Sequence, residues 1–223
     1  NIPIQDIKNY LQNRNLENFE QIIQEKAKEC DRVIAETEKL KTSLQLSLKA
    51  IEKIRQTRLD QIQLNFQEEK LLYLSEFLSE NMTMRDRIKI LSRHNQTAFS
   101  PKHFKELTTG WIVNKEDFFT EKFNKTQQFF TPVSPSFSKK HSFTRPAGLY
   151  LTLRFEGTYY QKISAAFSKI ENFMQRNHLN AMSDVYVFPL KNHWITEDLK
   201  TYINQISFQV ESTDDMPTEP PQD

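Results

Sequence analysis

The first third of the chain carries apolar side chains at a regular interval of seven residues. Residues 4–70 contain neither glycine nor proline, and Glu, Lys and Gln fill most positions between the apolar ones, so this segment is predicted to be helical. A sustained seven-residue repeat with charged flanks is typical of a coiled coil. One seam position is occupied by Leu16, Ile23, Cys30, Thr37, Leu44 and Ile51. The other is occupied by Phe19, Val33, Leu40 and Ile54, with Lys26 and Ser47 as the exceptions.

The length of this helix indicates a partner. We assign residues 16–66 to a coiled-coil dimerisation helix. Its seam of roughly 45 residues would run on the order of 65 Å at about 1.5 Å per residue, too long to be covered by the domain that follows. We therefore expect a homodimer through this helix, with parallel and antiparallel packing both open. A long helix folded back on its own chain is the alternative.

The two ends of the chain have their own patterns. Residues 1–15 predict a separate short helix, with three apolar side chains on one stripe and a proline in its first turn. The sequence does not begin with methionine, and its first residues already belong to this amphipathic helix. We therefore interpret the chain as a fragment of a longer protein. Residues 211–223 contain five acidic residues and three prolines, and we expect this acidic tail to be disordered.

Beyond residue 68 the composition shifts towards Phe, Tyr and Thr, and shorter runs of alternating polarity begin. Residues 69–210 predict one domain in which the order strand, helix, strand, strand occurs twice. Two such units normally combine into one antiparallel-rich sheet with both helices on one face, so the fold class is α+β and the other face is free to hold a ligand. The predicted elements are Leu71–Leu78, Met84–Phe99, Gly110–Phe119 and Gln127–Val133, followed by Leu149–Phe155, Tyr159–Asn177, Val185–Leu190 and Thr201–Val210.

Composition narrows the possible functions. A formal charge of +1 gives no basic field for nucleic acid or an acidic membrane, and no apolar run approaches the length of a membrane helix. Cys30 is the single cysteine, which excludes an internal disulfide and fits a reducing, cytoplasmic compartment. Because Cys30 lies in mid-seam and the five histidines show no paired spacing, we predict neither a metal nor another cofactor.

Three parts of the chain resemble, in order, parts of MerR-type transcription regulators. Residues 1–14 look like the last helix of the winged-helix head, and the coiled coil follows. The segments Arg-Pro-Ala-Gly-Leu-Tyr-Leu at 145–151, Phe-Glu-Gly-Thr-Tyr at 155–159 and the strand at 202–210 resemble the second half of a GyrI-like ligand-binding domain. This combination is similar to a multidrug-sensing regulator that lacks most of its DNA-binding head.

The resemblance implies a function and partners. It implies a cytoplasmic transcription activator, an antiparallel homodimer through the long helix, and multidrug-type effectors that are often cationic and aromatic. Promoter DNA would be contacted only through the missing N-terminal head, and RNA polymerase would be affected indirectly, through the shape of the promoter. No membrane contact is implied.

The resemblance also points to the strand after the second helix, where cation-sensing members carry a glutamate directly after a tyrosine. Here Val187 follows Tyr186, so the carboxylate is missing. Desolvating a cation without a buried carboxylate is costly, and we expect neutral or weakly charged ligands to bind about as well as cations. Other acids that could replace it are Glu76, Glu116 and Glu156.

Aromatic side chains are the better candidates for a ligand site, because flat rings stack on planar ligands. Strand alternation places Tyr150 with Thr152 and Arg154, opposite an apolar set that faces the helices. Packing in the core is the alternative for each of these rings. The ligand-binding candidates are Tyr150, Trp111, Tyr202, Tyr186 and Tyr159, together with the position of Val187.

Two other classes of function compete with a small-molecule sensor. Some GyrI-like domains resemble hydrolases that use a pocket glutamate, but Val187 occupies that position here, so we expect no catalytic residue and no enzyme activity. A coiled-coil adaptor that binds protein through the sheet is the third possibility. The favoured hypothesis is the sensor, with a small hydrophobic or aromatic ligand.

Overall fold

The computed structural model describes residues 8, 11–12, 14–99, 108–135, 137 and 142–212. The chain divides into two compact units, Asn1–Gln45 and Leu46–Asp223. The helix predicted over residues 1–15 lies largely outside the described residues, and so does the part of the acidic tail beyond Ser212. Glu211 and Ser212 themselves belong to the last strand and not to a disordered tail.

Helix α2 (Leu16–Arg55) confirms the helix predicted from the seven-residue repeat. It begins after Asn15, whose side-chain oxygen accepts a hydrogen bond from the backbone N–H of Asn18 at 2.7 Å and so caps the first turn. The large apolar side chains of the seam are between 40% and 76% exposed, except for Ile54, which is partly buried. The described residues of a single chain therefore leave most of this stripe uncovered.

Helix α2 ends at Arg55, short of the end predicted at residue 66, because residues 62–67 form strand β1 (Ile62–Gln67). β1 pairs along its whole length with β6 (Gly148–Glu156). Ile62 and Leu64 pack against the larger buried apolar cluster of the second unit, which we call the main core. The helical preference of this segment is a weak local effect, and long-range pairing and burial override it. The sequence prediction was wrong here.

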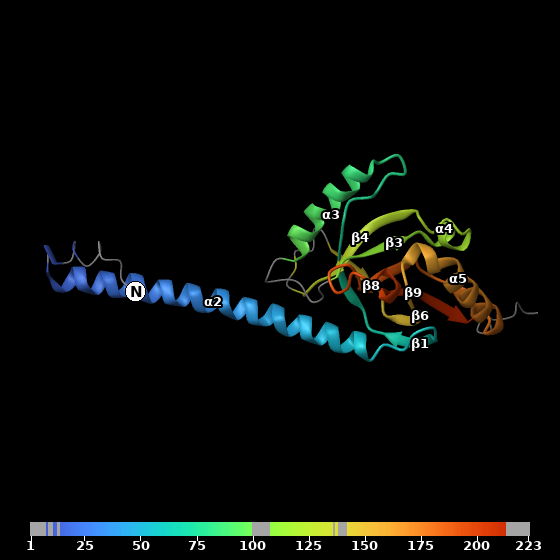
Figure 1. Cartoon of the computed structure of the whole chain (residues 1–223), viewed down its shortest axis with the longest axis horizontal. Helices are drawn as coiled ribbons and strands as arrows, with labels where there is room; N and C mark the ends of the chain where they lie inside the picture. Colours follow the sequence, from blue (N-terminus) through green and yellow to red (C-terminus); the bar gives the residue numbers. More distant parts are fainter. Residues whose placement is uncertain are drawn as a thin grey trace, which may run out of the picture. The chain divides into compact units, whose positions relative to one another are not determined.

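The predicted repeat of strand, helix, strand, strand is confirmed. In both repeats the spatial order of the strands is first, third, second, and the two second strands, β3 and β8, join the repeats. All pairings are antiparallel, and the described residues form a nine-stranded sheet (Figure 1). The repeats consist of β2 (Lys70–Leu74), α3 (Met84–Ala98), β3 (Gly110–Val113) and β4 (Thr126–Pro132), and of β6, α5 (Tyr159–Arg176), β8 (Val185–Lys191) and β9 (Ile203–Ser212).

Two strands outside the repeats, which we call the linking strands, pair with the edge strands of the repeats. β1 directly precedes β2 but pairs with β6, and β5 (Ser142–Arg145) directly precedes β6 but pairs with β2. Only residues 68 and 69 separate β1 from β2, and such a link spans at most about 11 Å. Strands at opposite ends of the strand order are thus brought together, so the sheet must curl strongly around one of its faces.

The segment predicted as strand Gly110–Phe119 contains a strand and a short helix. After β3, the side chain of Asn114 accepts hydrogen bonds from the backbone N–H groups of Glu116 and Asp117 and starts α4 (Lys115–Phe119). Phe118 of α4 is fully buried in the core. The remaining small elements are β7 (Leu179–Ala181), which pairs with β9, and a 3-10 turn, η2 (Leu199–Thr201).

Both long helices of the second unit cover the same face of the sheet. α5 packs on Leu151, Leu153 and Phe155, the apolar set that alternation predicted to face the helices. On α3, His94 lies 2.9 Å from the hydroxyl of Thr131, on the face of β4 that also carries Phe129 beside Trp111. The sequence prediction of two helices on one face is therefore confirmed.

The opposite, open face carries a second and smaller apolar cluster. Its buried members come from both repeats, and Ile54 of α2 and Leu59 pack against it. Both residues belong to the second unit, so the last turns of α2 share a core with the open face. The buried members are Leu72, Ile112, Phe130, Tyr186, Phe188, Leu190 and Ile203.

Candidate ligand-binding groove

The open face is hollowed by a cavity of about 200 Å³, which we call the groove. Strands of both repeats and both linking strands contribute to it, so it lies inside the curl of the sheet. Apolar rings form part of its lining, and amide and cationic side chains form the rest. The lining residues are Gln67, Lys70, Leu72, Phe130, Pro132, Arg145, Arg154, Tyr186, Phe188, Leu190, Gln205 and Ser207.

Arg145 occupies the place where the two linking strands meet. It is the last residue of β5, is paired with Lys70 of β2, and is only 9% exposed. Its Nη2 donates a hydrogen bond to Gln67 of β1 at 2.7 Å, while its Nε has no hydrogen-bond partner within the described residues. The guanidinium carbon lies 4.3 Å from the ring centre of Tyr150 and 5.9 Å from that of Tyr186.

Arg154 on β6 is the second guanidinium of the groove. Its Nε donates to the side-chain oxygen of Gln205 at 2.8 Å, and its Nη1 donates to that of Gln63 at 2.9 Å. Burial lowers the pKa of Arg154, which still leaves it charged near neutral pH. Neither Arg145 nor Arg154 takes part in an ion pair with another described residue.

The two tyrosines of this region are neutral. Burial raises the pKa of Tyr186, and the neighbouring Tyr150 adds to the rise. Burial also raises the pKa of Tyr150, against the opposing effect of Arg145. Tyr150 is fully buried and its hydroxyl donates to the backbone carbonyl of Pro146 at 2.9 Å. The groove therefore combines neutral aromatic surface with positive charge.

A second cavity, which we call the helix-face pocket, lies on the other side of the sheet. It measures about 420 Å³ and is bounded by α3, by the start of α5 and by the loop after β8. Trp111 meets Tyr159 edge-to-face at 5.2 Å, and Tyr202 and the exposed Trp194 complete much of the aromatic wall. This pocket is largely apolar.

The sequence-derived candidates therefore do not form one site. Tyr186 lines the groove, and Tyr150 lies beneath Arg145 at its border. The other three aromatic candidates, Trp111, Tyr159 and Tyr202, line the helix-face pocket. Their assignment to a ligand site stays a prediction.

Val187 lies in neither cavity. Its side chain is fully buried in the main core, on the face of β8 opposite Tyr186, and its register partner is Trp111 of β3. The three acids considered as replacements do not line the groove either. Sequence reasoning missed Arg145 as a site residue, although the alternation that grouped Arg154 with Tyr150 was a usable signal for the charge of this face.

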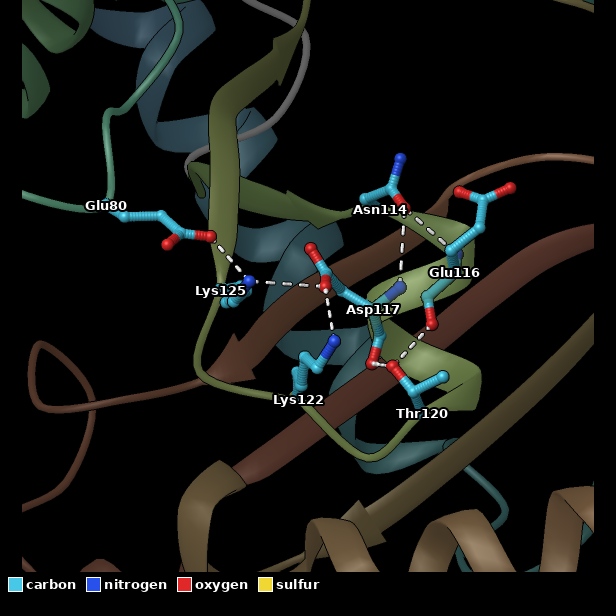
Figure 2. A network of polar contacts seen from close by, with 7 residues as sticks. All are labelled: Glu80, Asn114, Glu116, Asp117, Thr120, Lys122 and Lys125. Carbon is cyan, nitrogen blue, oxygen red and sulfur yellow. Dashed lines mark hydrogen bonds and ion pairs between the residues drawn. The ribbon is translucent and has the colours of Figure 1, made fainter.

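A polar network around α4 is the other concentration of charge (Figure 2). Asp117 lies 3.8 Å from the amine of Lys122 and 3.5 Å from that of Lys125, which also pairs with Glu80. The asparagine at the helix start completes the network. The charged groups are at least a quarter exposed, so water screens each ion pair, and we interpret the network as structural.

The other chemical candidates give no site. Cys30 is exposed on α2. Among the residues that the structure describes, no three His, Cys, Asp or Glu side chains gather closely enough to hold a metal ion. None of the described helices has the length and apolar character required to cross a membrane.

Comparisons with known proteins give likeness at the level of structure. No family model and no curated protein matches the sequence. The C-terminal domain of EcmrR matches with a TM-score of 0.53 at 14% identity, over 69% of this chain and 98% of that chain. EcmrR in complex with DNA matches with a TM-score of 0.51 at 16% identity, over 95% of this chain and 78% of that chain.

An uncharacterized conserved protein from Listeria innocua matches as well, with a TM-score of 0.53 at 9% identity, over 73% of this chain and 98% of that chain. Identities this low show the fold alone. The chain therefore shares an α+β fold with the EcmrR C-terminal domain over 69% of its length. In this chain a long helix precedes the curled antiparallel sheet.

Proposed function

We propose that this chain is the dimerising and effector-sensing part of a ligand-responsive transcription activator, and that a small planar molecule binds in the groove as its effector. The observation that carries the proposal is the open face of the sheet, which is hollowed by the groove and lined by aromatic and polar side chains from both repeats. At about 200 Å³ the groove is smaller than a typical drug-sized site of roughly 300 to 1,000 Å³, which favours a small ligand.

The role in transcription rests on two kinds of likeness. The sequence resembles a MerR-type regulator with a GyrI-like domain, and the fold is that of EcmrR, which has been solved in complex with DNA. We propose that promoter DNA is contacted through a winged-helix head, as the resemblance implies, and RNA polymerase indirectly. The cytoplasm is the compartment in which such a regulator would act.

We propose a homodimer through α2. Its seam is an exposed apolar stripe, and a second copy of the same helix would cover it by coiled-coil packing. Ile54, near the end of α2, packs against the apolar cluster of the open face. A ligand in the groove therefore lies close to side chains that contact the dimerisation helix, which gives it a physical route to a partner subunit.

Binding is favoured over catalysis by the chemistry of the groove. Its described lining contains no carboxylate and no imidazole, which are the usual general acids and bases. Burial raises the pKa of Tyr186, so this phenol is a poor base at neutral pH. We therefore propose no catalytic residue.

The proposal is tested by filling the groove. Gln205→Trp adds an indole ring to the lining of the groove. As a control, Trp194→Ala removes an indole ring from the helix-face pocket and leaves the groove unchanged. Calorimetric titration of the whole chain with a panel of bicyclic aromatic compounds should give binding that Gln205→Trp abolishes and Trp194→Ala leaves intact. The reverse pattern, or no binding by the folded wild type, would contradict the proposal.

A further inference from the structure

Cationic side chains gather in the lining of the groove. Three cationic side chains, those of Lys70, Arg145 and Arg154, contribute to its lining, and the described lining includes no acid. The acids nearest in sequence, Glu68 and Glu69, are exposed on the link between β1 and β2 and do not line the groove. A ligand in this groove would therefore meet a positive field.

Among the described residues, the two guanidinium groups donate hydrogen bonds to neutral acceptors only. Arg145 is nine-tenths buried and donates to the amide oxygen of Gln67, while its Nε has no partner in the described part of the chain. Arg154 donates to two amide oxygens, those of Gln63 and Gln205. A buried cation without a carboxylate is costly, and an anion beside it would offset much of that cost.

Arg145 already occupies part of the aromatic surface that could attract a cationic ligand. The guanidinium of Arg145 lies over the ring of Tyr150 and within 5.9 Å of the ring centre of Tyr186. This distance is within the range of a cation–π contact. A cationic ligand on the same rings would be repelled by Arg145, whereas an anion would be attracted to it.

On the basis of the function proposed above, we propose that the effector is a small planar aromatic carboxylate. Its carboxylate would be recognised by the guanidinium groups of Arg145 and Arg154, which suit planar oxyanions. Its ring would lie among Phe130, Tyr186 and Phe188, the apolar part of the same lining. The groove would thus select for negative charge in a fold whose resemblance implies cationic effectors.

Three ligands of nearly identical shape separate charge from size. 2-Naphthoate is an anion, 2-naphthamide is neutral and 2-naphthamidine is a cation, so the three differ mainly in the charge of one planar group. Titration calorimetry of the whole chain at neutral pH should give the tightest binding for the carboxylate, by at least tenfold over the amide, or about 1.4 kcal/mol, and weaker binding still for the amidine.

Variants locate the preference. Arg145→Gln should reduce the carboxylate-to-amide ratio at least fivefold, and Arg145→Lys should retain most of it because the charge is kept. Arg154→Gln provides an independent reduction if Arg145→Gln fails to fold, as judged by its thermal transition. Arg176→Gln removes the same charge from the exposed end of α5 and should leave the ratio unchanged.

The outcomes distinguish the two proposals. Equal binding of all three compounds, or preference for the amidine, overturns the inference on charge while the effector role of the groove stands. A carboxylate preference that survives both arginine-to-glutamine substitutions overturns the assignment to these residues. If none of the three binds to the folded protein, both the carboxylate ligand and the proposed site for planar ligands are overturned.

Discussion

The guanidinium carbon of Arg145 lies 4.3 Å from the ring centre of Tyr150, and the hydroxyl of that ring donates to the carbonyl of Pro146 at 2.9 Å. The ring is thus fixed between a cation on its face and a hydrogen bond at its edge. Since Pro146 lies on the link between β5 and β6, this contact fastens the link to the sheet on which Arg145 is presented.

Tyr150→Phe should therefore destabilise the protein. The substitution removes the hydroxyl and with it the hydrogen bond to the carbonyl of Pro146, which costs about 1 kcal/mol. Urea unfolding followed by circular dichroism measures the difference. Tyr160→Phe, in which the lost hydroxyl belongs to a 69% exposed side chain, is the matched control and should change stability by much less. Equal effects of the two substitutions would argue against the structural role of the Pro146 contact.

Substitutions in the seam of α2 should separate the subunits. Leu40→Asp together with Leu44→Asp places charges at two exposed seam positions, and the dimer we propose cannot bury them without a large cost. Sedimentation equilibrium should then report monomers. Lys39→Asp with Thr42→Asp introduces two acids of the same kind on positions outside the seam and should leave the dimer intact. Persisting dimers in the seam variant would place the interface in the second unit.

Val187→Glu should lower stability and should not create a cation site. Val187 is fully buried in the main core, so a glutamate there would have to be desolvated without a partner, at a cost of about 3 to 5 kcal/mol. Thermal unfolding checks the prediction, with Asn180→Glu on an exposed position of β7 as the control. A folded Val187→Glu variant of wild-type stability that binds cations would show that this side chain reaches the ligand.

His94 should make stability depend on pH in the acid range. Burial lowers the pKa of His94 to about 4, below the ordinary value of about 6.5 expected when the chain is unfolded. The unfolded state thus binds a proton first as the pH falls, so the stability contribution is present above pH 6.5 and is lost progressively towards pH 4. The loss is about 3 kcal/mol in all.

The measurement is the free energy of unfolding of wild type and His94→Gln between pH 7 and pH 4. The variant should lack this part of the pH dependence, although it is less stable at pH 7 because the stacking on Tyr73 and the contact with Thr131 are lost. His178→Gln, which removes an exposed imidazole, is the matched control. Parallel curves for wild type and His94→Gln would mean that His94 titrates normally in the folded state.

Local patterns were sufficient for most of the fold. The alternation of polar and apolar residues in β6 placed Leu151 and Leu153 towards the helices, and the repeat of element types gave the sheet its two halves. Neither needs information on distant contacts. β1 was missed because its strand conformation depends on pairing with β6, more than eighty residues later, and its local sequence continues the composition of the helix.

The candidate site could be predicted only in part, because a cavity depends on how the sheet curls. Tyr186 and Val187 are neighbours, and alternation alone shows that only one of them can face the groove. The resemblance directed attention to Val187, but the structure places Tyr186 on that face. Arg145 had no local signal, since its burial comes from the meeting of two linking strands that are far apart in sequence.

The exchange of β1 and β5 between the repeats makes the second unit equivalent to a domain-swapped pair fused into one polypeptide. Each repeat lends its leading strand to the other and receives one in return, which is the arrangement that two identical half-chains with exchanged arms would adopt about a twofold axis. The first strand of each repeat is paired on its outer side with a strand that precedes the other repeat, so neither half forms its part of the sheet alone. The groove is lined by residues of both repeats and of both exchanged strands. It therefore resembles a ligand site between two subunits of a dimer, although a single chain forms it.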